Sequence, residues 1–261
     1  AFRLFELGVR VLRVNLRNAG GGFGLAKKIY HCGRSDDLRV VLEWLHARAP
    51  VSPLALLGFS LGASLTLKLA IEAAAAPVPG LDCVLAANPP IDLEACCRYL
   101  QRPGGRLYDR HLVLLLKREI QRLHNRFPEL GPVPSALGRV TTLFEFDDVY
   151  TAPRNGFEGA LDYYQKCSTH RRIPEIVLPG VVIHAADDPF IDVEPFRQVA
   201  FPSRLTLDLQ AHGGHLGYFG TSEPPRGRRW LDARLTDWLV HRWALVPRDG
   251  SVIGPDIDNP E

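Results

Sequence analysis

The stretch Leu54-Ala55-Leu56-Leu57-Gly58-Phe59-Ser60-Leu61-Gly62-Ala63 decides the fold of this chain. Four apolar residues before the first glycine predict a buried strand, and the Leu- and Ala-rich run over residues 61–76 predicts a helix. Ser60 therefore falls on the turn between a strand and a helix. The alternative is a Gly/Ser turn that only starts a structural helix, but the order of strand, serine and helix favours a nucleophile.

This turn has the pattern Gly-x-Ser-x-Gly of a nucleophile elbow, in which a strained backbone holds the serine hydroxyl above the sheet. We expect Gly58 and Gly62 both to be required, because the sharp turn brings their backbones too close for a Cβ. The backbone N–H of Leu61 opens the helix and points at the space above Ser60. An ester carbonyl attacked by the serine would become an oxyanion there.

Further short apolar runs predict the other strands of a mostly parallel sheet, at residues 9–15, 83–87, 180–185 and 204–209. A helix is predicted from residue 35 to about 47, with Ser35 as its N-cap, and a closing helix over residues 228–243. The carboxylates of Asp36 and Asp37 are explained by the positive end of the first of these helices. They need no catalytic role.

Residues 91–174 have a different character, with amphipathic helical patterns and no strand-like run; the clearest pattern covers residues 111–127. We predict a helical cap inserted between two core strands, with its apolar stripe packed on the core rather than laid on a membrane. The predicted class is α/β. Its core comprises residues 1–90 and 175–246, its cap residues 91–174 and its flexible tail residues 247–261.

The glycine-rich residues 19–24 follow a predicted strand, as a dinucleotide-binding loop would. Their spacing does not give Gly-x-Gly-x-x-Gly, and no helix opens directly after them. A flexible rim loop of the active site is the favoured interpretation, and no cofactor is predicted.

Composition limits the partners. The chain has 261 residues, 46% of them hydrophobic, and a formal net charge of +2 without a basic stripe, which argues against nucleic acid. Its five cysteines include the adjacent Cys96 and Cys97 and no Cys-x-x-Cys, which argues against a disulfide framework or a zinc knuckle and favours the cytoplasm. No apolar stretch is long enough for a membrane span, and no signal peptide is visible.

The chain has no methionine, and residues 1–8 have the pattern of a helix end closed by Gly8. We therefore expect that an upstream segment is missing and that this is a fragment lacking the first strands of the sheet.

A serine nucleophile needs a histidine base and an acid that fixes the tautomer of that base. In proteins with an elbow the acid and then the base follow the serine, each on a loop after a strand. The strand at residues 180–185 runs into Asp187 and Asp188, and the strand at residues 204–209 runs into His212-Gly213-Gly214-His215.

Each loop offers two candidates. The acid is expected three residues beyond the small residue that ends its strand, which selects Asp188 and leaves Asp187 to bond the turn. For the base we select His215, because Gly213 and Gly214 give the backbone freedom to present it, and His212 is the alternative. A metal site made of these two aspartates and two histidines is the sharpest competing hypothesis, but it leaves the elbow unexplained.

Several motifs together resemble the YheT-like branch of the alpha/beta-hydrolase superfamily, from the first residue to about Trp243. They are Asn15-Leu16-Arg17, Tyr30-His31-Cys32-Gly33-Arg34-Ser35-Asp36-Asp37-Leu38, Gly58-Phe59-Ser60-Leu61-Gly62, Phe146-Asp147-Asp148 with Thr151-Ala152-Pro153, Asp162-Tyr163-Tyr164, His184-Ala185-Ala186-Asp187-Asp188-Pro189-Phe190 and His212-Gly213-Gly214-His215.

This resemblance implies a serine esterase with a helical cap and the triad Ser60, Asp188 and His215. Relatives act on short- to medium-chain acyl esters or phospholipids, and some fungal members transfer acyl groups to alcohols, so a small ester or lipid is the expected substrate. A non-catalytic binding protein with this fold is a further alternative.

Two departures from the family pattern bear on activity. Ala63-Ser64 replace the usual Gly-Asn after the elbow, and the upstream strand ending in His-Gly is absent. Because that strand leads into the loop that supplies half the oxyanion hole, we expect this chain by itself to be a weak enzyme.

Overall fold

The computed structural model describes residues 1–220 and 228–245, and the chain divides into two compact units. Residues 15–216 form the larger unit, which contains every predicted site residue. The smaller unit comprises residues 1–14 and the chain from Gly217 onward. The tail at residues 247–261, predicted to be flexible, lies outside the described residues.

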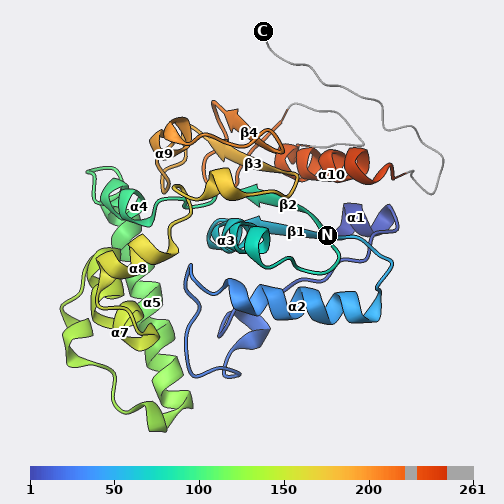
Figure 1. Ribbon diagram of the computed structural model, residues 1–261. Coiled ribbons are helices and arrows are strands. Elements are labelled where there is room, and N and C mark those ends of the chain that lie inside the picture. Colours follow the sequence, from blue (N-terminus) through green and yellow to red (C-terminus); the bar gives the residue numbers. More distant parts are fainter. Residues whose placement is uncertain (221–227, 246–261) are drawn as a thin grey trace. The chain divides into compact units, whose positions relative to one another are not determined.

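A parallel sheet forms the centre of the larger unit, with the strands in the order in which they occur along the chain (Figure 1). The strands are β1 (Leu54–Phe59), β2 (Leu81–Ala87), β3 (Gly180–Ala185) and β4 (Leu205–Gln210). In their register Phe59 lies beside Ala87, Ala87 beside Ile183, and Ala185 beside Gln210. Since the strands are parallel, the loops after all of them lie at one edge of the sheet.

Helix α3 (Leu61–Ala75) connects β1 to β2 and α2 (Ser35–Arg48) packs against it. One side of α3 joins the core of the sheet, where Leu67, Val84 and Val182 are fully buried. Its other side carries Leu65 and Leu69, which pack with the buried leucines of α2. This double burial explains why the α3 sequence is apolar on nearly every side and why the helix rigidly follows Ser60.

Residues 91–174 contain helices and no strand, as predicted. They form α4 (Leu93–Leu100), α5 (Arg106–Arg126), α6 (Leu143–Phe146), α7 (Ala152–Asn155) and α8 (Ala160–Cys167), with a π-helical turn at Asp147–Thr151. The short α9 (Glu194–Gln198) follows β3. The division into core and cap stays a prediction.

The smaller unit contains α1 (Phe2–Glu6) and α10 (Trp230–Trp243). As predicted, α1 ends near a glycine in the left-handed region, since Gly8 has a φ of 83°. Among the described residues, no helix is long and apolar enough to span a bilayer.

Two local predictions are wrong. Residues 9–15 form no strand, because no strand of the described residues pairs with them, and Leu12 is 52% exposed. Ser35 is the first helical residue rather than the N-cap of α2, and its hydroxyl instead donates to the Glu72 carboxylate at 2.8 Å.

Candidate active site

Ser60 lies between β1 and α3 with φ 50° and ψ −123°, the strained backbone that the elbow predicts. A Cβ on Gly58 would lie 2.3 Å from the carbonyl oxygen of Gly62, so only glycine fits there. The same expectation for Gly62 is wrong. A Cβ at Gly62 would meet no atom within 4 Å outside its own helix turn and its neighbours in the chain, because that position faces open space.

The imidazole of His215 connects Ser60 to Asp188. Its Nε2 lies 2.9 Å from the Ser60 hydroxyl oxygen, and its Nδ1 lies 2.9 Å from Oδ2 of Asp188. The histidine follows β4 after the two glycines, of which Gly214 adopts a φ of 54°. The structure therefore brings the three predicted residues together in one hydrogen-bonded chain.

Asp188 is completely buried at the end of the turn after β3. Its Oδ1 accepts the backbone N–H groups of Phe190 and Ile191, at 2.8 and 3.2 Å. Its Oδ2 accepts from His215 and from the Asn88 side-chain amide, the latter at 2.6 Å. Four hydrogen-bond partners around one carboxylate fix its orientation.

Asp187 and His212, the alternative acid and base, form a separate pair on the surface. Oδ1 of Asp187 accepts the backbone N–H groups of Gly214 and Gly213 at 2.8 and 2.9 Å, and these bonds, the first above all, lower its pKa. The His212 side chain is 90% exposed and its Nδ1 lies 3.3 Å from Oδ2 of Asp187. Asp187 thus stabilises, through hydrogen bonds to its backbone, the turn that precedes His215.

Asn88 was not identified from the sequence as a site residue. It follows β2, is completely buried, and has a φ of 49°, in the left-handed region that asparagine tolerates. Besides Asp188, its amide donates to the carbonyl of Gly214 at 3.2 Å. One side chain therefore ties the acid loop to the histidine loop. Its position directly after a parallel strand was the available signal.

The immediate surroundings of the histidine are aromatic. The ring of Phe190 meets the His215 imidazole edge-to-face at 4.7 Å, and the ring of Tyr108 from α5 meets Phe190 at 4.9 Å. These two rings form an aromatic wall on one side of the histidine.

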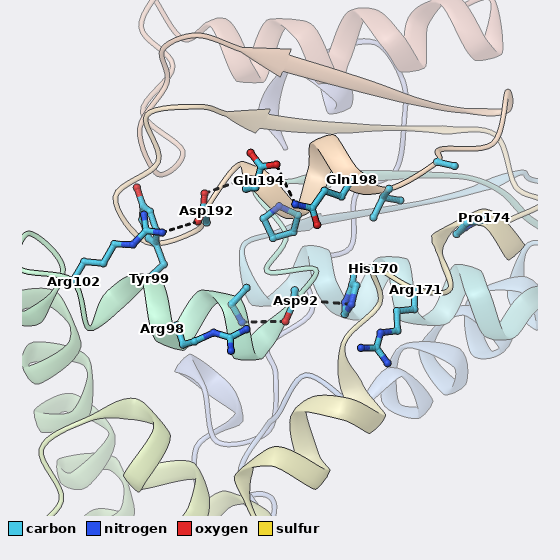
Figure 2. Close-up of a pocket in the computed structure, with 14 residues that line it drawn as sticks. Asp92, Arg98, Tyr99, Arg102, His170, Arg171, Pro174, Asp192, Glu194 and Gln198 are labelled. Atoms are coloured by element: carbon cyan, nitrogen blue, oxygen red, sulfur yellow. Dashed lines mark hydrogen bonds and ion pairs between the residues drawn. The ribbon is translucent and has the colours of Figure 1, made fainter.

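A cavity of about 710 Å³ lies elsewhere, between α4, residues 170–174 and α9 (Figure 2). Two pairs of its polar side chains meet: Arg102 lies 3.3 Å from Asp192, and His170 lies 3.7 Å from Asp92. Ser60 does not line it, so this cavity is separate from the hydrogen-bonded chain described above.

The motif residues Asp147 and Tyr164 meet inside the helical segment. The Tyr164 hydroxyl donates to Oδ2 of Asp147 at 2.7 Å and lies 3.0 Å from Sγ of Cys97. Burial raises the pKa of Asp147 to about 6. Among the described residues, no three His, Cys, Asp or Glu side chains are grouped to hold a metal ion.

Comparison with known proteins agrees with this architecture. A family model described as the alpha/beta hydrolase family matches residues 2–227. The chain is 35% identical over 231 residues to "Putative esterase YheT" of Escherichia coli, covering 87% of this chain and 66% of that protein. It is 29% identical over 239 residues to a monoacylglycerol lipase of Saccharomyces cerevisiae, covering 88% of this chain and 51% of the lipase.

An esterase of Pyrococcus furiosus superposes with a TM-score of 0.50 at 17% identity, covering 92% of this chain and 72% of the esterase. These matches confirm the predicted fold class. The chain spans just under two thirds of the length of the bacterial relative and about half that of the yeast lipase.

Proposed function

Because the chain belongs to the alpha/beta hydrolase family and is similar to YheT, we propose that it cleaves carboxylic esters through an acyl-enzyme on Ser60. One observation carries the proposal: the continuous hydrogen bonds from the Ser60 hydroxyl through His215 to Asp188, each 2.9 Å long. A serine, a histidine and a buried carboxylate in this arrangement activate the serine hydroxyl.

The reaction follows from these contacts. Nε2 of His215 accepts the hydroxyl proton while Ser60 Oγ attacks the ester carbonyl, and the resulting imidazolium is stabilised by Asp188. The same proton then passes to the departing alkoxide, which leaves as the alcohol. Water attacks the acyl-serine in a second cycle, with His215 again as the base, and the carboxylic acid is released.

The oxyanion of each tetrahedral intermediate needs hydrogen-bond donors. Leu61 is the first residue of α3, and an N–H at this position has no acceptor within its own helix. The positive end of the helix adds to the stabilisation. We therefore assign the Leu61 N–H as one oxyanion donor.

The substrate class that we propose is a short- to medium-chain acyl ester or a lipid ester. The aromatic wall beside His215 and the similarity to a yeast monoacylglycerol lipase support an apolar acyl group. Acyl transfer to an alcohol is the second candidate, because a medium-chain fatty acid ethyl ester synthase/esterase of yeast is 40% identical over 75 residues. An alcohol would then replace water in the second cycle.

A fluorophosphonate probe tests the nucleophile directly, since it reacts with an activated serine without requiring the natural substrate. We expect labelling of the wild-type protein at Ser60 and none of Ser60→Ala. A folded wild-type protein that is never labelled there would leave a binding protein as the function. A series of p-nitrophenyl esters of rising chain length, with and without added ethanol, then separates hydrolysis from acyl transfer by its products.

A further inference from the structure

The solvent-facing side of α5 has an unusual composition. Four apolar side chains are exposed there: Leu107 is 78% exposed, and Tyr108, Leu114 and Leu115 are each 45% exposed. Isolated exposed leucines are ordinary, but these recur at helical spacing, so they share one side of the helix. The opposite side is buried, with Ile120 and Leu123 completely enclosed. We call the exposed side the α5 face.

The α5 face also carries cations. Arg110 and Arg118 are exposed and form no ion pair with any described residue, and Arg122 lies over the ring of Phe23. The acids of α5 are Asp109 and Glu119, of which Glu119 lies at the edge of the α5 face, since it follows Tyr108 by about three helical turns. Asp109 is buried and accepts the N–H of Leu143, while Glu119 is half-buried.

The α5 face reaches the proposed active site at its first turn. Tyr108 contacts Phe190, and Phe190 contacts the His215 ring, which is bonded to Ser60. From there α5 runs away from the sheet (Figure 1). A surface bound along α5 would therefore reach, at its Tyr108 end, the rings that contact His215.

We propose that the α5 face docks on an anionic lipid surface, from which ester substrate passes to Ser60. This inference rests on the proposed ester hydrolysis. Leucines beside unpaired arginines on one helix are the composition of an interfacial helix, in which the leucines enter the acyl boundary and the arginines meet anionic headgroups. Nucleic acid would meet the arginines but would leave the exposed leucines without an apolar partner.

Vesicle co-sedimentation tests the proposal in the full chain carrying Ser60→Ala, so that binding is measured without turnover. We expect binding to phosphatidylcholine vesicles that contain roughly 30% phosphatidylserine, and much less to pure phosphatidylcholine. Because each basic residue near such a surface contributes about fivefold in partitioning, Arg110→Glu/Arg118→Glu should lower the partition coefficient at least about 25-fold. Leu114→Ser/Leu115→Ser should also weaken binding.

Matched control variants separate the face from net charge and from general hydrophobicity. Arg171→Glu/Arg204→Glu makes the same charge change at two exposed arginines outside α5, and Leu161→Ser/Val177→Ser removes two exposed apolar side chains elsewhere. Both control variants should bind vesicles as tightly as the full chain that carries Ser60→Ala alone.

The proposal is overturned if the α5 variants bind as tightly as these controls, if no anionic vesicle is bound, or if a DNA duplex is preferred to vesicles. The two proposals can fail separately. If the protein binds vesicles but Ser60 of the wild type does not react with the fluorophosphonate, only the hydrolase assignment is refuted.

Discussion

Replacing each of the two neighbouring aspartates by asparagine gives the sharpest test of the proposed mechanism. Asp188→Asn and Asp187→Asn remove the same charge from adjacent residues, yet the structure predicts very different losses. The difference arises from what each carboxylate oxygen accepts.

At position 188 an asparagine cannot satisfy its surroundings. The backbone N–H groups of Phe190 and Ile191 require an oxygen at the Oδ1 position, which forces the new NH₂ group to the Oδ2 position. There it faces the amide of Asn88, itself a donor, and the Nδ1 atom of His215. For Nδ1 of His215 to accept a hydrogen bond from this NH₂ group, the imidazole must carry its proton on Nε2. In that tautomer it cannot take the proton of Ser60.

A wrong tautomer of this kind lowers kcat by about 10⁴ in a serine triad, which corresponds to about 5 kcal/mol of transition-state stabilisation. At position 187, by contrast, an amide oxygen still accepts the N–H groups of Gly213 and Gly214. The bond that is lost leads only to the exposed His212. We expect a change in kcat of less than about tenfold for Asp187→Asn.

The assay is hydrolysis of p-nitrophenyl butyrate under saturating conditions, with the concentration of each purified variant taken from its absorbance at 280 nm. Circular dichroism of both variants controls for misfolding. If Asp187→Asn loses more activity than Asp188→Asn, or if the two folded variants are equally active, the acid has been assigned to the wrong residue.

Four further substitutions address the nucleophile, the elbow and the helical segment. Ser60→Ala should lower kcat by about 10⁶ with an unchanged circular dichroism spectrum, because triad members act as a unit. Gly58→Ala should lower the melting temperature strongly, since its Cβ would lie 2.3 Å from the carbonyl oxygen of Gly62, whereas Gly62→Ala should melt like the wild type. Asp147, with its pKa raised to about 6 from 3.8, binds a proton more tightly in the folded state, so this residue should contribute a decline in stability of up to about 3 kcal/mol as pH rises between these values. Asp147→Asn should abolish that decline in urea unfolding measured at several pH values, and an unchanged pH dependence would contradict it.

The sequence predicted the sheet well where short apolar runs end in chemically distinctive loops. All four strands that the described residues contribute to the sheet were predicted, because buried parallel strands appear as compact Val, Leu, Ile and Ala runs. The strand predicted at residues 9–15 has the same local pattern and forms none. Local composition cannot show whether a neighbouring strand is there to pair with it.

The error at Gly62 has a similar origin. The Gly-x-Ser-x-Gly pattern is symmetric about Ser60, but the turn is not. The backbone before Ser60 passes under the first turn of α3, so Gly58 contacts Gly62 and Thr66, while Gly62 itself faces open space. A sequence motif records which residues occur, and only the packing shows which of them is sterically required.

Asn88 shows most clearly why part of the site could not be predicted. Asp188 and His215 were predicted because their residue types carry acid and base chemistry, whereas an asparagine after a strand is typical of any turn. Its contribution depends on three parallel strands ending side by side, which brings the loops after β2, β3 and β4 within reach of one amide. That amide bonds the same Oδ2 atom that holds the imidazole and also the carbonyl of Gly214 beside it. The orientation of His215 toward Ser60 therefore depends on a contact between residues 88 and 188, which only the register of the sheet brings together.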